Sequence, residues 1–65
     1  MKVTCDPQVD VLRIALRDVA VHESDESQPG VILDFHDEGR VVGIEILDAS
    51  LRVAQPRVVE LAVTG

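Results

Sequence analysis

The sequence predicts a mainly β fold, a small antiparallel β-meander of five or six short strands with one short helical turn. The chain has 65 residues, enough for a single domain spanning residues 1–65. Its apolar residues alternate over short segments, as in half-buried strands. Pro, Gly and Asp separate these segments. The alternative is an α+β fold in which the meander ends in a C-terminal helix.

The first two predicted strands are residues 2–5 and 11–16. In the second, Leu12, Ile14 and Leu16 share one face and Arg13 lies on the other. The intervening segment begins Asp6-Pro7, where Pro fixes φ and the Asp side chain can cap a turn. These features predict a β-hairpin.

The next segment predicts a weak third strand and a loop. Val19 and Val21 alternate over residues 19–23, which favours a strand. Residues 24–30 are polar and end in Pro29-Gly30, which is typical of a loop.

Residues 31–35 and 40–47 predict a pair of strands around a four-residue loop, 36–39. Val42, Ile44 and Ile46 lie on one face of the second strand. Its other face is partly apolar, which predicts a central strand or one at an interface. The residues on that face are the interface candidates Val41, Gly43, Glu45 and Leu47.

After residue 47 the sequence predicts a helical turn within residues 48–53. Either Asp48 or Ser50 is placed to act as its N-cap. The segment 57–63 is rich in β-branched valine, which favours a strand. A short helix, with Val58 and Leu61 on one side, is the alternative.

Hydrophobic residues make up 46% of the chain, and Phe35 is its only aromatic residue. So small a sheet has few inward positions, so this content predicts a homodimer that covers a second face. Cys5 is the only cysteine, so no disulfide within the chain is expected. Cys5, His22 and His36 are also scattered singly, which argues against a zinc site of the usual clustered type.

Charge and segment composition limit the partners. Six basic residues stand against twelve acidic ones, for a net charge of −6. The basic residues are dispersed without stacking aromatics, which disfavours nucleic acid but is compatible with a small basic protein. The N-terminal residues lack a signal-peptide pattern, and no run approaches the ~20 apolar residues of a membrane helix. We expect a small soluble protein of the cytoplasm, without membrane contact.

Three blocks of the sequence resemble a known family. They are Asp6-Pro7-x-x-Asp10-x-Leu12-x-Ile14-x-Leu16, Pro29-Gly30-Val31-Ile32-Leu33-Asp34 and Gly39-Arg40-x-Val42-Gly43-Ile44-Glu45-Ile46-Leu47-Asp48-Ala49-Ser50. The blocks resemble the YuzE-like family of small bacterial proteins, catalogued as a domain of unknown function. The chain departs from the family where relatives carry an aromatic before Asp-Pro, and at Val11-Leu12-Arg13, where Ala-Leu-Tyr is usual. The resemblance implies no activity, but genes of such proteins can lie beside small toxin-like proteins, which makes an antitoxin-like role conceivable.

The densest group of possible metal ligands is Asp34, His36, Asp37 and Glu38. The competing interpretation is that these side chains only solubilise a hairpin tip. Glu45 and Asp48 could serve acid–base chemistry if burial raised the pKa of Glu45. Alternatively, Glu45 pairs with Arg13 across strands and Asp48 caps a turn.

No catalytic or cofactor-binding pattern accompanies these candidates. Cys5 has no histidine placed beside it by sequence, and no nucleophile elbow or glycine-rich phosphate loop occurs. We therefore expect a protein-interaction or assembly module rather than an enzyme, without a cofactor. A small-ligand or divalent-metal-binding domain is the alternative, and an enzyme built at a dimer seam is the third possibility.

Overall fold

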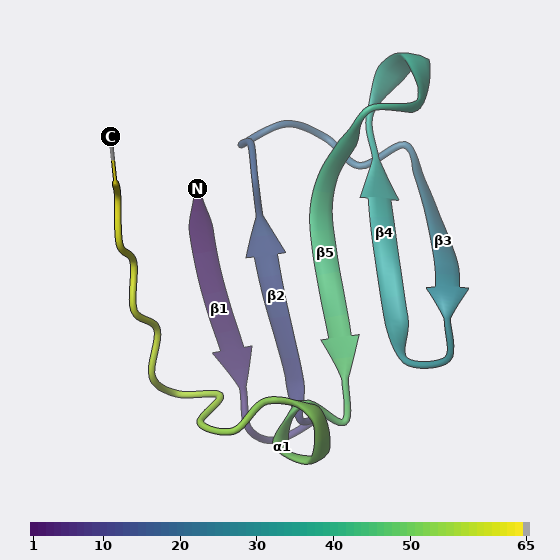
Figure 1. Ribbon diagram of the computed structural model, residues 1–65. Helices are drawn as coiled ribbons and strands as arrows, with labels where there is room; N and C mark the ends of the chain where they lie inside the picture. The colour runs from purple at the N-terminus through teal and green to yellow at the C-terminus, as the bar shows by residue number, and fades with distance from the viewer. Residues whose placement is uncertain (65) are drawn as a thin grey trace.

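The computed structural model describes residues 1–64, which form one five-stranded antiparallel sheet (Figure 1). Its elements are β1 (Lys2–Asp6), β2 (Val11–Ala15), β3 (Glu23–Gln28), β4 (Val31–Phe35), the 3₁₀ turn η1 (Asp37–Gly39), β5 (Val41–Leu47) and α1 (Ala49–Arg52). The predicted mainly β class, with one short helical turn, is confirmed. The helix α1 has four residues, and no helix within residues 1–64 could cross a membrane.

The strands lie in the order β1-β2-β5-β4-β3. The β1–β2 hairpin and the β3–β4–β5 run join where β5 pairs with β2. The order therefore departs from an uninterrupted meander, because the β2–β3 connection passes the ends of β5 and β4 to reach the far edge (Figure 1). The prediction that the two-sided strand is central is confirmed by the position of β5.

The third strand lies later in the sequence than predicted. Residues 24–30 were expected to be a loop, but β3 occupies Glu23–Gln28, and Val19 and Val21 lie in the preceding connection. Every residue of β3 is exposed, so its pairing with β4 is not accompanied by an alternating apolar pattern. An edge strand that is held mainly by backbone hydrogen bonds needs no alternating apolar residues, so hydrophobic periodicity does not predict it.

The register aligns apolar side chains into two rows across one face of the sheet. Opposed residues of paired strands share a face. The first row is Cys5, Leu12, Ile46 and Val31, and the second is Val3, Ile14, Ile44 and Leu33; on the edge strand β3 the rows end in Gln28 and Asp25. The eight residues of β1, β2, β5 and β4 in these rows are called the apolar face. The opposite side, called the polar face, carries the rows Thr4, Arg13, Glu45, Ile32, Glu26 and Lys2, Ala15, Gly43, Asp34, Ser24.

The sheet has no second layer within residues 1–64. Figure 1 shows no helix lying across either face, and the molecule measures 34 × 33 × 19 Å. The buried apolar side chains of this part of the chain are Leu12, Val42 and Ala49. Domains are normally built from two packed layers. The central residues of the apolar face are consequently only half-buried.

The start of α1 is fastened to the β1–β2 turn. Asp48 occupies the N-cap position in a left-handed conformation, with φ of 51°, and makes no side-chain capping bond. The Asp10 carboxylate instead accepts hydrogen bonds from the Ser50 backbone N–H (3.0 Å) and hydroxyl (2.6 Å). Ala49 N–H donates to the Asp10 carbonyl and its side chain is fully buried. The side chain that accepts hydrogen bonds from the first turn of α1 is therefore that of Asp10 and not that of Asp48.

The prediction of a strand at residues 57–63, and its helical alternative, are both wrong. These residues form neither a strand nor a helix. In Figure 1 they lie on the outer side of β1, away from β2. Val58, Val59, Leu61 and Val63 are all exposed. Alternating apolar residues produce a strand only where a neighbouring strand accepts and donates backbone hydrogen bonds, and this segment has no sheet partner.

Candidate functional site

A polar cluster occupies the middle of the polar face. Asp34 of β4 is 1% exposed, the most deeply buried charged side chain of residues 1–64. Its Oδ1 accepts a hydrogen bond of 2.7 Å from the Ser24 hydroxyl of β3. Its Oδ2 lies 3.7 Å from Arg13 Nε of β2. Three strands thus converge on one carboxylate.

Gly43 of β5 makes the space that Asp34 occupies. A Cβ at position 43 would lie 2.9 Å from Asp34 Oδ2 and 3.4 Å from Arg13 Nη2. The first distance is shorter than real Cβ contacts allow. The central strand therefore needs a residue without a side chain at this point, so that Asp34 can lie over its backbone.

Glu45 is the second carboxyl group of the cluster. A hydrogen bond with Asp34 raises the pKa of Glu45, burial and the negative charge of Asp34 raise it further, and the charge of Arg13 opposes this. Asp34 Oδ2 is shielded from solvent and has no hydrogen-bond partner within residues 1–64. The protonated form of Glu45 can donate to Asp34 and the ionised form cannot, which is the physical cause of the raised pKa of Glu45.

The predicted pairing of Glu45 with Arg13 is confirmed as a cross-strand register, but the ion pair of Arg13 is with Asp34. Beside the cluster is a pocket of about 340 Å³ lined by Thr4, Asp6, Val9, Val11, Arg13 and Glu45. The arrangement brings two carboxyl groups and one guanidinium together on the polar face.

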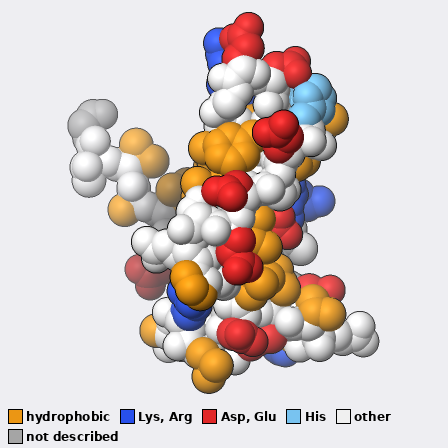
Figure 2. Space-filling view, turned by 90° about the vertical axis from the view of Figure 1, so that its right-hand side faces the viewer, with side chains coloured by type: hydrophobic (Ala, Val, Ile, Leu, Met, Phe, Trp, Pro, Cys, Tyr) orange, Lys and Arg blue, Asp and Glu red, His pale blue; other side chains and the backbone are white. Residues whose placement is uncertain are grey.

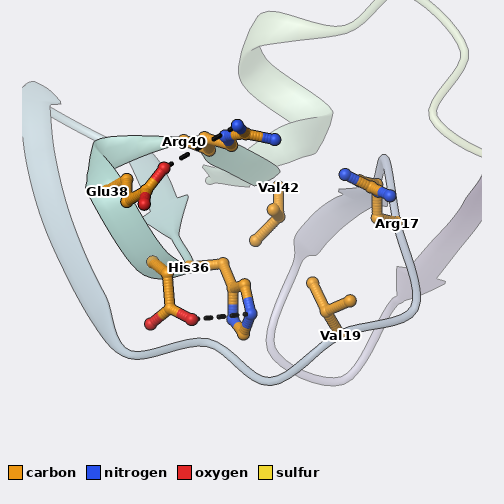
Figure 3. Close-up of a pocket in the computed structure, with 7 residues that line it drawn as sticks. Arg17, Val19, His36, Glu38, Arg40 and Val42 are labelled. Atoms are coloured by element: carbon orange, nitrogen blue, oxygen red, sulfur yellow. Dashed lines mark ion pairs between the residues drawn. The ribbon is translucent and has the colours of Figure 1, made fainter.

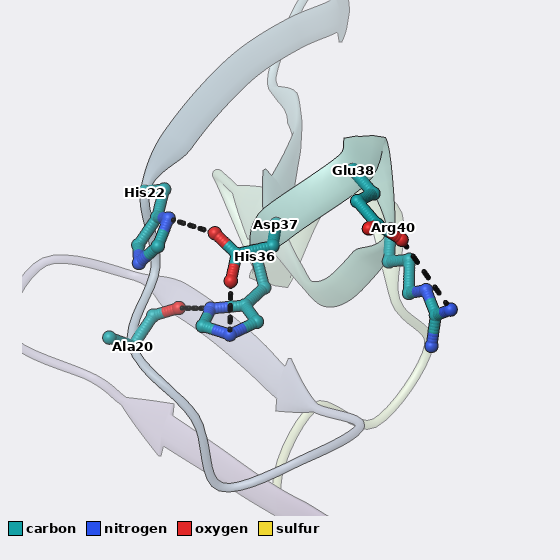
Figure 4. A network of polar contacts seen from close by, with 6 residues as sticks. All are labelled: Ala20, His22, His36, Asp37, Glu38 and Arg40. Carbon is teal, nitrogen blue, oxygen red and sulfur yellow. Dashed lines mark hydrogen bonds and ion pairs between the residues drawn. The ribbon is translucent and has the colours of Figure 1, made fainter.

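The fold separates the four predicted metal ligands. Asp34 belongs to the polar cluster, whereas His36 and Asp37 follow β4 at the end of the sheet. Glu38, with φ of 60°, turns toward Arg40, whose Nη2 lies 3.7 Å from Glu38 Oε2 (Figure 4). The structure therefore brings together only two of the four, His36 and Asp37.

His22, from the β2–β3 connection, completes a cluster with His36 and Asp37 that the sequence analysis missed (Figure 4). His22 Nδ1 lies 2.8 Å from Asp37 Oδ1, and His36 Nε2 lies 3.5 Å from Asp37 Oδ2. The two rings have centroids 4.5 Å apart. The separation of the histidines in sequence gave no sign of this. A correct prediction of the pairing between β3 and β4 would have placed His22 near His36, because the His22 N–H donates a hydrogen bond to the Phe35 carbonyl.

A pocket of about 350 Å³ lies next to this histidine cluster, between the β2–β3 connection and the β4–β5 turn (Figure 3). Its lining includes His36 and Asp37 on one side and Val19 and Arg17 on the other. The cluster therefore borders a space that solvent or a small ligand can enter.

The four interface candidates lie on or near the polar face. Gly43 and Glu45 belong to the polar cluster, Leu47 is half-buried opposite Val11, and Val41 is exposed. Their role in an interface stays a prediction.

Comparison with protein families gives a match over most of this structure. The family model described as "Protein of unknown function (DUF2283)" matches residues 2–50. The chain belongs to the DUF2283 family. The DUF2283 match includes all five strands and the first two residues of α1, and leaves out the C-terminal segment. No curated protein and no solved structure gave a significant match to the chain.

The sequence blocks that prompted the resemblance meet in the DUF2283 fold. Asp10 of the first block binds Ser50 of the third, and Asp34 of the second lies over Gly43 of the third. Both contacts join elements far apart in sequence. Each block therefore contains residues whose contacts join separate elements of the fold, and these contacts need no activity to account for them.

Proposed function

We propose that this DUF2283 domain is an assembly module that forms a homodimer by stacking the apolar faces of two copies. The observation that carries the proposal is the apolar face itself, seven aliphatic side chains and Cys5 in two unbroken rows. Nothing within residues 1–64 forms a second layer over it. A second copy supplies that layer and creates a β-sandwich.

The size of the face is sufficient for a specific interface. Five strands of five to seven residues give each face a footprint of roughly 400–550 Å². Two stacked faces bury on the order of 1,000 Å², near the lower limit for specific interfaces. Only part of this area is apolar, because Glu23 and Asp25 of β3 lie on the same side, and association itself costs ~4–15 kcal/mol. The size of the face is therefore compatible with a dimer.

The acidic edge favours stacking of faces over pairing of edges. β3 carries Glu23, Asp25 and Glu26, and acidic side chains run along the edge that Figure 2 shows. Like charges on an exposed edge strand disfavour the addition of another copy of that strand. Assembly through β3 would therefore be repulsive, whereas stacking uses the apolar rows of β1, β2, β5 and β4, with Glu23 and Asp25 at the rim of that face.

A second candidate is the acidic partner of a small basic protein, in an antitoxin-like role. The acidic β3 edge lies beside the apolar rows, and the chain carries a net charge of −6. A basic protein with an apolar centre would complement both. The proposed role is non-catalytic in either case. A cytoplasmic location, bacterial origin and closer kinship to YuzE-like proteins are part of the same proposal.

Sedimentation equilibrium of the purified chain tests the dimer. We expect a mass twice the 7.1 kDa of the chain at micromolar concentration. A mass of 7.1 kDa up to millimolar concentration would contradict the proposal. For the second candidate, tagged protein is recovered from nuclease-treated lysate of its own source and its native mass measured. A fixed-ratio complex with a small basic protein supports that candidate, and a dimer alone argues against it.

A further inference from the structure

The histidine cluster, His22, His36 and Asp37, joins two separate segments at one end of the sheet. Ala20 and His22 come from the β2–β3 connection, and His36 and Asp37 from the turn between β4 and β5 (Figure 4). One ligand atom from each of the three cluster residues lies within 4.8 Å of the others. The cluster shares no residue with the apolar face, so it is independent of the proposed dimer.

The hydrogen bond of His36 fixes its tautomer. His36 Nδ1 lies 2.7 Å from the Ala20 carbonyl oxygen. A carbonyl oxygen only accepts, so Nδ1 carries the proton and donates it. In the neutral ring, Nε2 then has a free lone pair. This arrangement, with the far nitrogen bound to a backbone carbonyl, is the one found in metal-ligating histidines.

The free nitrogen of His36 faces another acceptor. Its Nε2 lies 3.5 Å from Asp37 Oδ2, and a carboxylate oxygen accepts hydrogen bonds without donating them. With the neutral ring, two lone-pair-bearing atoms therefore face each other, and a proton or a metal ion between them removes their repulsion. A second ring, His22, lies beside His36 and approaches the other oxygen of the same carboxylate (Figure 4).

The distances suit a small divalent ion. Ligands at ~2.0–2.1 Å from Zn²⁺ are separated by about 2.9 Å at right angles and about 3.3 Å in a tetrahedron. The observed separations from Asp37 oxygens are 2.8 Å to His22 Nδ1 and 3.5 Å to His36 Nε2. Small rotations of exposed side chains therefore complete the geometry. Two imidazoles and one carboxylate favour zinc over the oxygen-preferring Mg²⁺ and Ca²⁺.

We propose that His22, His36 and Asp37 form a Zn²⁺ site that ties the β2–β3 connection to the β4–β5 turn. His36 binds through Nε2, and His22 through Nδ1 after its ring proton moves to Nε2, so that each neutral ring keeps one proton. Asp37 supplies a carboxylate oxygen. The remaining position opens toward the pocket lined by Arg17, Val19 and Arg40 (Figure 3), where water completes the coordination.

Thermal unfolding of the full chain at pH 7.5 tests the site, with Zn²⁺ added and Mg²⁺ as the comparison ion. Saturating Zn²⁺ is expected to raise Tm by at least about 5 °C, with no effect of Mg²⁺. His22→Gln should abolish the shift. Glu38→Gln, which alters a neighbouring carboxylate outside the cluster, should keep it.

Imidazole ¹H–¹⁵N spectra of the unmodified protein make the test independent of variant folding. One equivalent of Zn²⁺ should shift the ring nitrogens of both His22 and His36. The proposal is overturned if Tm does not move at millimolar Zn²⁺, or if the shift persists in folded His22→Gln. It is also overturned if only one histidine responds.

Discussion

The two faces of the sheet are built by the same strands, yet they meet their packing requirements differently. On the polar face, the Asp34 carboxylate accepts a hydrogen bond from Ser24 and lies beside Arg13 and Glu45 of its own chain. On the apolar face, Ile44 and its neighbours lie in two rows that no second layer within residues 1–64 covers. Polar groups are satisfied by local pairing, whereas apolar area is removed from water only by another layer. This difference is the reason that we propose the apolar face as the site of assembly.

Placing a lysine on each face of β4 should give the largest difference. Leu33 and Ile32 are adjacent and both half-buried, but Leu33 lies on the apolar face and Ile32 on the polar face. Leu33→Lys puts an ammonium group into the dimer interface, where its neighbour in the register is Asp25 and desolvation of the charge opposes association. We therefore expect the dissociation constant of the dimer to rise at least about 100-fold. Sedimentation equilibrium measures this constant.

The matched control is Ile32→Lys, whose new ammonium lies between Glu26 and Glu45 in the register. We expect this variant to keep the wild-type dimer mass. Equal weakening of the dimer by both substitutions would show that the faces do not differ in the way described.

On the polar face, Gly43→Ala should produce the next largest effect. The added methyl would lie 2.9 Å from Asp34 Oδ2, so the buried carboxylate or the central strand must move. Such overpacking costs about 1–3 kcal/mol of unfolding free energy. Urea titration checks it, with Gly39→Asn as control. Gly39 has open space around it, and Asn tolerates its φ of 72°. A loss in the control as large as in Gly43→Ala would contradict the packing argument.

Glu45→Gln should give a smaller, pH-dependent effect. The pKa of Glu45 is raised, chiefly by its hydrogen bond with Asp34. The stability contributed by its proton is therefore complete below the ordinary value of 4.5 and is lost as the pH rises through the folded-state pKa. Gln keeps a hydrogen-bond donor at every pH, although it loses the attraction of Arg13. We expect Glu45→Gln to gain up to about 1 kcal/mol at pH 7.

This gain should shrink as the pH falls toward 4, measured by denaturant unfolding at each pH. Glu26→Gln, an exposed change on the same face, is the control and should show no such trend. A gain that grows on acidification would reverse the sign of the proposed linkage.

The fold was predictable where side-chain pattern and backbone pairing agree. The alternation of Leu12 and Ile14 located β2, and the two-sided pattern around Ile44 identified a central strand. β3 was missed because an edge strand with exposed polar side chains has no apolar period. The C-terminal segment has that period without a partner strand, so it was predicted wrongly.

The candidate sites were predictable only in part, because they depend on pairing between distant segments. His36 and Asp37 were identified from their density in one loop, but His22 enters through the β2–β3 connection. Asp34 was grouped with them by sequence, whereas strand alternation turns it onto the polar face over Gly43. The separation of the two histidines in sequence argues against a clustered zinc site, but the structure places their rings side by side.

The most direct test of the account is an isotope-filtered NOE experiment on a dimer mixed from labelled and unlabelled chains. The account predicts contacts between copies from the methyl groups of Ile14, Leu33 and Ile44, and none from Val11 or Ile32. Contacts between copies through Val11 and Ile32, or none at all at millimolar concentration, would contradict it.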